Sequence, residues 1–166
     1  LIFVWRCTVC NKIFISFHSV KGTESQYLGI FPNKTISYSD NFIADISPRF
    51  IEIYNQALTA ESNNCITLAA VGLRTALEVL IKDYAVNCLH EEKDEVINLT
   101  LNNAISKYLD DAMLNTADVV RILGNDHTHY ARKYPEHDFI LLKEYMNIFI
   151  SLIRAKIMTQ NPPVGR

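Results

Sequence analysis

The stretch from Arg121 to His129 places an arginine, an asparagine and two histidines close together, and these side chains could act on a phosphate group. If the stretch is helical, Arg121, Asn125 and His129 lie on one face, since they are spaced i, i+4 and i+8, and His127 points to another side. Arginine can bind a phosphate with two parallel hydrogen bonds, and histidine can exchange a proton near neutral pH. Together they suit metal-independent RNA cleavage, in which a base activates the 2′-hydroxyl and a cation stabilises the phosphorane.

A structural role is the alternative for the same row of side chains. Asn125 and His129 would then bond to the backbone and to neighbouring helices, and Gly124 would allow a close helix contact. Several basic or titratable residues lie near this row and could form a small electropositive rim; a solvated loop before Pro135 explains them equally well. They are His127, Arg132, Lys133 and His137.

Arg74 and Glu78 lie one helical turn apart beside an apolar stripe. The ordinary interpretation is an i, i+4 ion pair on the helix surface. If both side chains point partly inward, they support the candidate site by orienting Asn125 or His129, because charges next to a core need partners.

The pair Cys7-x-x-Cys10 is half of a zinc-binding knuckle. Two thiolates at this spacing can hold one side of a tetrahedral zinc ion, and a complete site needs two further ligands. The sequence has no second CxxC, so the alternative is a metal-free hairpin with reduced thiols. The candidate chemistry at Arg121 needs no cofactor.

Composition limits the class of protein. Hydrophobic residues make up 49% of the chain and charged residues 20%, which is typical of a soluble globular domain. A net charge of −2 argues against a broad surface for duplex DNA, although a local basic site for RNA or a nucleotide is compatible with it. No apolar run reaches the roughly 18 residues that span a bilayer, and the cysteines fit a reducing compartment, so we expect no membrane contact and a cytoplasmic location.

The chain changes character near residue 46. Residues 1–46 predict a β-hairpin and an extended lead-in that carries the CxxC, with turns and irregular chain after about residue 21. Ser47-Pro48 predicts a helix start, and apolar residues at helical spacing then predict five amphipathic helices over residues 47–160. We expect the last of these helices over about 138–158, and a disordered tail over 161–166. The predicted fold class is mainly α, a bundle of about five helices with a short N-terminal hairpin.

Several motifs together resemble the domain-of-unknown-function 4145 family (DUF4145) of bacterial proteins. They are Tyr54-Asn-Gln-Ala57, Arg74-Thr-Ala-Leu77-Glu78, and Arg121-Ile-Leu-Gly124-Asn125 followed by His129. The CxxC ahead of the helices is also similar to a feature of that family.

The resemblance implies a branch of the HEPN superfamily, which are helical bundles that commonly form homodimers. Many HEPN proteins are metal-independent ribonucleases of defence, stress or restriction systems, with an arginine four to six residues before a histidine; others are non-catalytic. His127 has that spacing from Arg121, with five residues between them, whereas His129 has seven but matches the family's own pattern. Two functions therefore remain open: an RNA-cleaving or RNA-binding module, and a non-catalytic dimerising or nucleotide-sensing module.

Overall fold

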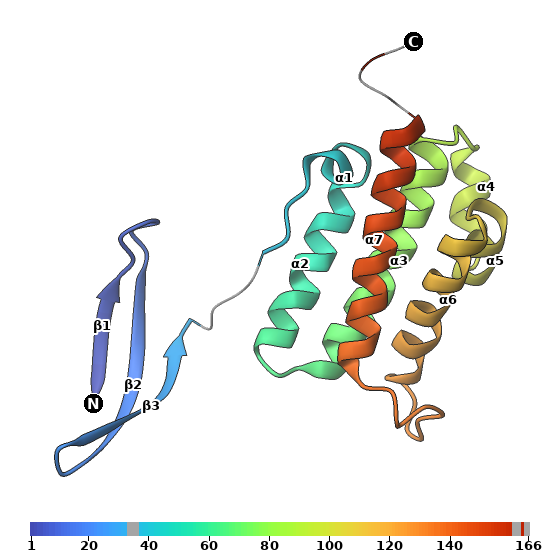
Figure 1. Cartoon of the computed structure of the whole chain (residues 1–166). Helices are drawn as coiled ribbons and strands as arrows, with labels where there is room; N and C mark the ends of the chain where they lie inside the picture. The colour runs from blue at the N-terminus through green and yellow to red at the C-terminus, as the bar shows by residue number, and fades with distance from the viewer. Residues whose placement is uncertain (33–36, 161–163, 165–166) are drawn as a thin grey trace. The chain divides into compact units, whose positions relative to one another are not determined.

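A computed structural model describes residues 1–32, 37–160 and 164 of the chain. It divides into two compact units, Leu1–Ile36 and Ser37–Arg166, which are drawn in Figure 1. The expected architecture is confirmed, since the first unit is a small antiparallel sheet and the second is helical. The tail predicted over 161–166 lies outside the described residues, apart from Val164.

The first unit is a three-stranded antiparallel sheet in the order β1 (Ile2–Arg6), β2 (Ile13–Lys21), β3 (Glu24–Phe31). β1 and β2 form the predicted hairpin, in which Trp5 pairs with Phe14. β3 corrects the expectation of irregular chain after residue 21. Gly22 has a φ of 63°, which permits a tight turn, and the following β-forming residues then pair with β2 from Lys21↔Glu24 onward.

The second unit contains, within the described part of the chain, seven helices. They are α1 (Asn41–Ile46), α2 (Pro48–Ser62), α3 (Ile66–Asn87), α4 (Lys93–Asn98), α5 (Leu101–Tyr108), α6 (Asp111–Asp126) and α7 (Phe139–Gln160). Four of these, α2, α3, α6 and α7, correspond to predicted helices. The third predicted helix is divided into α4 and α5, because the chain is extended at Leu99 and Thr100, and the Thr100 hydroxyl caps α5 by accepting from the Asn103 N–H at 3.3 Å.

Two further differences lie at the start of the helical unit. Residues 41–46, expected in the lead-in, form α1, and the Asp40 carboxylate caps it by accepting from the Ile43 N–H at 3.2 Å. Ser47 occupies the capping position of α2 as predicted, with Pro48 first in the helix. Its hydroxyl does not cap the helix, however, because it donates to the Asp83 carboxylate of α3.

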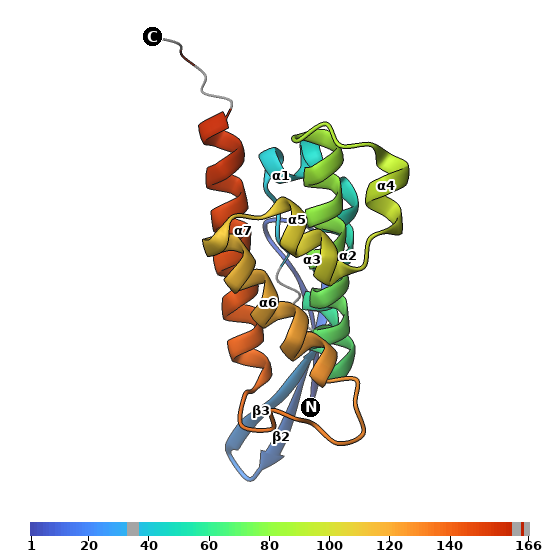
Figure 2. The ribbon, with the colours of Figure 1, turned by 90° about the vertical axis from the view of Figure 1, so that its right-hand side faces the viewer.

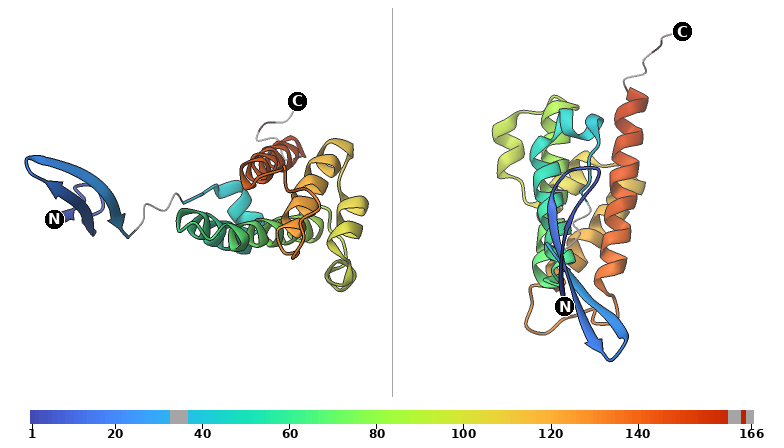
Figure 3. Two further views of the ribbon diagram at one scale, coloured as in Figure 1. Left: turned by 90° about the horizontal axis from the view of Figure 1, so that it is seen from below. Right: turned by 90° about the vertical axis from the view of Figure 1, so that its left-hand side faces the viewer.

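The four longer helices share one core (Figure 2). α3 packs against both α2 and α6, and α7 packs against α6 and α3. Viewed end-on, α4 and α5 lie beside α3 and α6 at one side of this unit (Figure 3). The largest fully buried side chains include Phe50, Leu73, Leu77, Leu80, Ile81, Tyr84, Met146, Phe149 and Ile153. None of the helices in the described ranges combines the length and apolarity of a bilayer crossing.

Two glycines set the spacing of these helices. A Cβ added at Gly72 of α3 would lie 2.8 Å from the Ala57 Cβ of α2, and one added at Gly124 of α6 would lie 2.8 Å from the Arg74 Cβ of α3. Both distances are too short for two carbon atoms. The backbones of α2, α3 and α6 therefore approach as closely as they do because these two positions lack a side chain.

Candidate functional site

Helix α6 and the loop that follows it carry the candidate residues. The Asp110 carboxylate caps α6 by accepting from the Met113 N–H at 3.3 Å, and the helix ends at Asp126. The helix does not continue through to His129. Instead, turn hydrogen bonds join the Thr128 N–H to the Asn125 carbonyl at 3.0 Å and the His129 N–H to the Asp126 carbonyl at 3.2 Å. These turns fold His129 back toward the end of α6.

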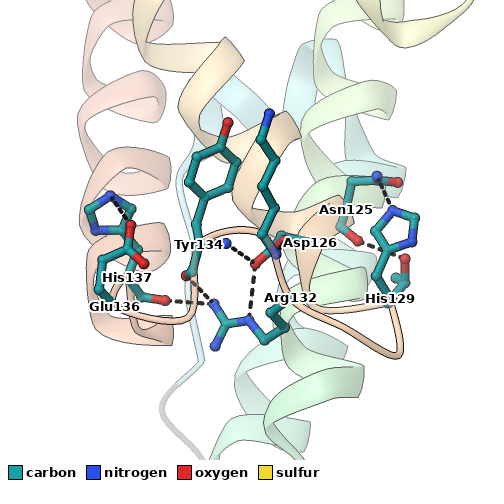
Figure 4. Close-up of polar contacts among 9 residues, drawn as sticks. Asn125, Asp126, His129, Arg132, Tyr134, Glu136 and His137 are labelled. Atoms are coloured by element: carbon teal, nitrogen blue, oxygen red, sulfur yellow. Dashed lines mark hydrogen bonds and ion pairs between the residues drawn. The ribbon is translucent and has the colours of Figure 1, made fainter.

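A buried carboxylate organises this loop (Figure 4). Asp126 is 4% exposed, and its Oδ1 accepts from the Lys133 N–H at 2.6 Å. Its Oδ2 accepts from Arg132 Nε at 3.0 Å and from the Tyr134 N–H at 3.3 Å. Arg132 Nη2 in turn donates to the carbonyls of Tyr134 and His137, at 3.1 and 2.6 Å. Residues 132–134 and His137 are thus held to the end of α6 by one ion pair and its hydrogen bonds.

The pKa of Asp126 follows from the same contacts. Burial alone would raise it, but the hydrogen bonds from the Lys133 N–H, the Arg132 side chain and the Tyr134 N–H outweigh that effect, so the pKa is lowered. The carboxylate therefore remains ionised whenever the loop is folded near neutral pH.

The loop and α6 together form an open hollow of about 460 Å³, which we call the Arg121 pocket. Its lining brings together three of the predicted site residues, Arg121, Asn125 and His129. The remaining lining residues are Ile122, Asp126, Ala131, Lys133 and Tyr134. The row of side chains predicted from the sequence therefore faces one hollow that is accessible to a ligand.

Arg121 is partly engaged within the chain. Its Nε donates to Asp118 Oδ1 at 2.8 Å, one turn earlier in α6, and 26% of its side chain is exposed. Its two terminal nitrogens make no hydrogen bond within the described residues, so they are available to a ligand. Lys133 adds a second cation, whose Nζ lies 5.2 Å from the centre of the Tyr134 ring.

His129 is oriented by Asn125. The Asn125 amide nitrogen donates to His129 Nε2 at 2.9 Å, and both residues are exposed (Figure 4). Since an amide nitrogen can only donate, Nε2 is the accepting, unprotonated nitrogen of a neutral imidazole. A ligand that donates a proton to Nε2 would have to replace Asn125.

His127 is not part of the Arg121 pocket, although its spacing from Arg121 is the one expected of a HEPN ribonuclease. It is half-buried, and its Nε2 is enclosed without a hydrogen-bond partner among the described residues. Burial lowers the pKa of His127, the positive charge of Arg132 lowers it further, and Asp126 partly opposes both effects. His127 is therefore held neutral beside the site.

This burial gives a prediction about stability and pH. Below about pH 6.5, the unfolded chain protonates His127, whereas the folded chain does so only at lower pH. Because the unfolded state then binds more protons, stability falls as the pH drops below about 6.5 and continues to fall until the folded pKa is passed. Urea unfolding at pH 7.5 and 5.5 should show a smaller pH difference for His127→Phe than for the wild type. The control His90→Asn, which removes an exposed histidine, should behave like the wild type, and an equal pH difference in His127→Phe would contradict the assignment.

Arg74 and Glu78 are not brought into the Arg121 pocket. Arg74 lies against Gly124, next to Asn125 in the chain, and its Nε is buried without a hydrogen-bond partner in the described ranges. Glu78 is 4.0 Å from Arg74 Nη1 but only 2.9 Å from Lys82 Nζ, and it lines a different hollow beside Lys82 and Asp83. Arg74 therefore packs against α6 beside Asn125 without lining the Arg121 pocket, and Glu78 lines the other hollow.

Cys7 and Cys10 form the turn between β1 and β2. The Cys7 N–H donates to the Lys12 carbonyl at 2.8 Å, and Asn11 has a φ of 57°, so the chain folds tightly around the first thiol. Hydrogen bonds from the backbone of Cys10, the backbone of Val9 and the side chain of Cys10 lower the pKa of Cys7. Such a turn suits two thiolate ligands of a zinc ion. The described residues contain no cluster of three or more metal-binding side chains, so further ligands would come from elsewhere.

Sequence reasoning missed the organising role of Asp126 and Arg132. Arg132 and Lys133 were noted only as a possible basic rim, and Asp126 and Tyr134 were not singled out. A signal was present, since an aspartate at the end of a helix can accept from several N–H groups of the following loop. The six residues between Asp126 and Lys133 gave no local pattern that would identify them as partners.

Comparison with known proteins supports the family suggested by the motifs. The family model described as Domain of unknown function (DUF4145) matches residues 55–160. The matched range contains both Arg74–Glu78 and the stretch from Arg121 to His129. No curated protein and no solved structure matches the chain.

Proposed function

The chain belongs to the DUF4145 family, and we propose that it binds and cleaves RNA without a metal ion at the Arg121 pocket. The observation that carries this proposal is the convergence of Arg121, Asn125 and His129 on one open hollow. The two terminal nitrogens of Arg121 suit the bidentate binding of a phosphate. Lys133 supplies a second positive charge at the same hollow.

The reaction uses the groups present. The 2′-hydroxyl of the bound RNA replaces Asn125 as the donor to His129 Nε2 and gives up its proton there. The 2′-oxygen bonds to phosphorus, and the bond to the 5′-oxygen breaks. Arg121 stabilises the charge that develops on the phosphorane oxygens. Water gives a proton to the leaving 5′-oxygen, and His129 later loses its proton to solvent. The products are a 2′,3′-cyclic phosphate and a 5′-hydroxyl.

We propose further that the chain forms a HEPN-like homodimer that acts in a bacterial defence or stress system. This proposal rests on the family resemblance of the helical motifs. Exposed apolar residues on α7, including Ile140 and Ile148, are compatible with pairing. The proposal also includes zinc held by Cys7 and Cys10 together with ligands from outside the described residues.

A non-catalytic role is the second candidate, and one observation favours it. Arg121 Nε is paired with Asp118, and His129 Nε2 is paired with Asn125, both within the chain. Pairs of this kind stabilise the end of a helix and its loop without any ligand. The module would then dimerise or sense a nucleotide instead of cleaving RNA.

The test compares RNA cleavage by the wild type, Arg121→Ala and His129→Ala, with EDTA present. We expect His129→Ala to lower the cleavage rate at least about 100-fold, because a general base contributes roughly 10²–10⁴-fold. Arg121→Ala should cause a loss of about 100-fold or more, which is typical of one group that stabilises a developing charge. The control Arg49→Ala removes an exposed arginine of α2 and should cleave like the wild type.

The products separate the possible outcomes. Cleavage that ends in 2′,3′-cyclic phosphates and is absent on a 2′-deoxy substrate supports the mechanism. Equal and negligible cleavage by the wild type and both variants would favour the non-catalytic role. Equal cleavage well above background would show that Arg121 and His129 are not the groups responsible.

A further inference from the structure

A second hollow adjoins the Arg121 pocket between α6, the loop and α7. Its volume is about 310 Å³, and we call it the Tyr145 pocket. The residues that line it are Val119, Ile122, Leu123, Tyr134, His137, Leu141 and Tyr145. None of these is an aspartate, glutamate, lysine or arginine, whereas the Arg121 pocket contains cations. Two hollows of different chemistry therefore lie next to each other.

The two hollows share a wall. Ile122 and Tyr134 line both of them, so a ligand could occupy both by passing over these two side chains. Figure 4 shows Tyr134 between the Asn125–His129 pair and His137. The backbone of Tyr134 is fixed at both ends, because its N–H donates to Asp126 and its carbonyl accepts from Arg132. The wall is thus held in place before any ligand arrives.

The lining of the Tyr145 pocket suits a flat aromatic group. The rings of Tyr134 and His137 are stacked, with centroids 6.2 Å apart and an angle of 24° between their planes. Tyr145 adds a third aromatic ring, and the remaining lining residues are aliphatic. A nucleobase presents a π-face to such rings. The phosphate of the same nucleotide carries the negative charge that the neighbouring hollow would bind.

We propose that the Tyr145 pocket binds the nucleobase of the RNA nucleotide whose phosphate lies in the Arg121 pocket. This inference rests on the proposed function and makes it more specific. A base inserted between α6 and α7 cannot remain stacked in a duplex, so the substrate is an unpaired nucleotide. Contacts made by aromatic faces tolerate different bases. The pocket should therefore bind a strand that carries any unpaired base more tightly than a strand without bases.

The test measures binding of two labelled oligonucleotides by fluorescence anisotropy. One is a short 2′-O-methyl RNA, which cannot be cleaved, and the other has the same backbone with every base removed. The wild type should bind the base-bearing strand about 10-fold more tightly, since stacking of one base is worth roughly 5- to 100-fold in affinity. Leu141→Gln makes the pocket polar and Val119→Trp fills it, so both should remove this preference without weakening binding of the base-free strand.

Two further variants complete the design. The control Leu68→Gln changes an exposed apolar residue of α3 outside the pocket and should keep the preference. Arg121→Ala should weaken binding of both strands alike, because each carries phosphates. Circular dichroism of each variant checks that the helices are intact.

The outcomes distinguish the two proposals. If the wild type binds both strands equally, and Arg121→Ala weakens both, the base pocket is refuted and the phosphate site stands. If Leu141→Gln and Val119→Trp keep the preference for bases, the bases bind elsewhere and the inference is likewise refuted. If Arg121→Ala weakens neither strand, or the wild type binds neither, the proposed function fails and the base pocket fails with it.

Discussion

Replacing Gly124 by valine should destabilise the helical unit by about 3 kcal/mol or more. A Cβ at this position would lie 2.8 Å from the Arg74 Cβ and 3.3 Å from the Ala70 carbonyl oxygen, so α6 and α3 would have to separate. Overpacking of this kind costs roughly 1–3 kcal/mol and occasionally more, and the branched valine adds two methyl groups. For a unit of this size, Tm should fall by roughly 10 °C.

Gly124→Ala should show a smaller loss, of about 1 kcal/mol. It makes the same Cβ clash, but alanine gains about 1 kcal/mol of helix propensity over glycine. Because the clashing atom is the Arg74 Cβ, Arg74→Ala should not rescue either variant. Thermal unfolding by circular dichroism measures all of these changes.

The matched control for this prediction is Asn115→Val, at an exposed position of the same helix. It introduces the same branched side chain without the contact to α3, and it should change stability by no more than about 0.5 kcal/mol. A Gly124→Val protein as stable as Asn115→Val would mean that the helices adjust freely. Gly124 would then have no role in the spacing of α3 and α6.

Much of the helical fold could be predicted because its period is strong. The stripe of Phe50, Ile53, Tyr54, Ala57 and Leu58 predicted α2; Ile53 is half-buried and the other four side chains are buried. The predictions failed where local features compete with periodicity. The third predicted helix is interrupted at Thr100, whose hydroxyl begins a new helix, and β3 was missed because its turn at Gly22 was interpreted as the end of regular structure.

The candidate site was predicted in part from helix periodicity, which applies to Arg121 and Asn125 but not to His129. Arg121 and Asn125 share a face of α6, as a helical period requires. His129 reaches the same hollow although the helix has already ended, because turn hydrogen bonds bring it back to Asn125. Helix geometry therefore identified the histidine that lines the hollow, but the conformation of the loop depends on Asp126 and on contacts several residues away, which helical periodicity does not predict.

Replacing Asp126 by alanine should unfold the loop between α6 and α7 and lower Tm by roughly 5–10 °C. The substitution removes one acceptor that serves the N–H groups of Lys133 and Tyr134 and the Nε of Arg132. Each of these donors would lose its partner, and losing hydrogen bonds to a charged group is especially costly. The wall formed by Tyr134 would lose its support, so RNA affinity should fall as well.

Hydrogen exchange of individual amides gives the sharpest measurement of this effect. The amides of Lys133 and Tyr134 should exchange much faster in Asp126→Ala, whereas amides within α3 should be unaffected at moderate pH. Asp126→Asn should be intermediate, since its remaining carbonyl oxygen can accept from only part of the loop. The control Asp118→Ala removes a carboxylate that pairs with Arg121 and that accepts, among the described residues, from no N–H of the loop, so exchange at Lys133 and Tyr134 should be unchanged.

The low-pH behaviour of the wild type should follow the same contacts. Because the pKa of Asp126 is lowered in the folded state, its ionised form stabilises the protein above the unfolded pKa of about 3.9. That contribution is lost as the pH falls through the folded pKa. Loss of protection at the Lys133 and Tyr134 amides, measured relative to the intrinsic exchange rate at each pH, should therefore appear in the wild type only at acid pH. In Asp126→Ala it should appear at every pH. Equal exchange in the two proteins at pH 7 would mean that the loop is held by contacts other than this carboxylate.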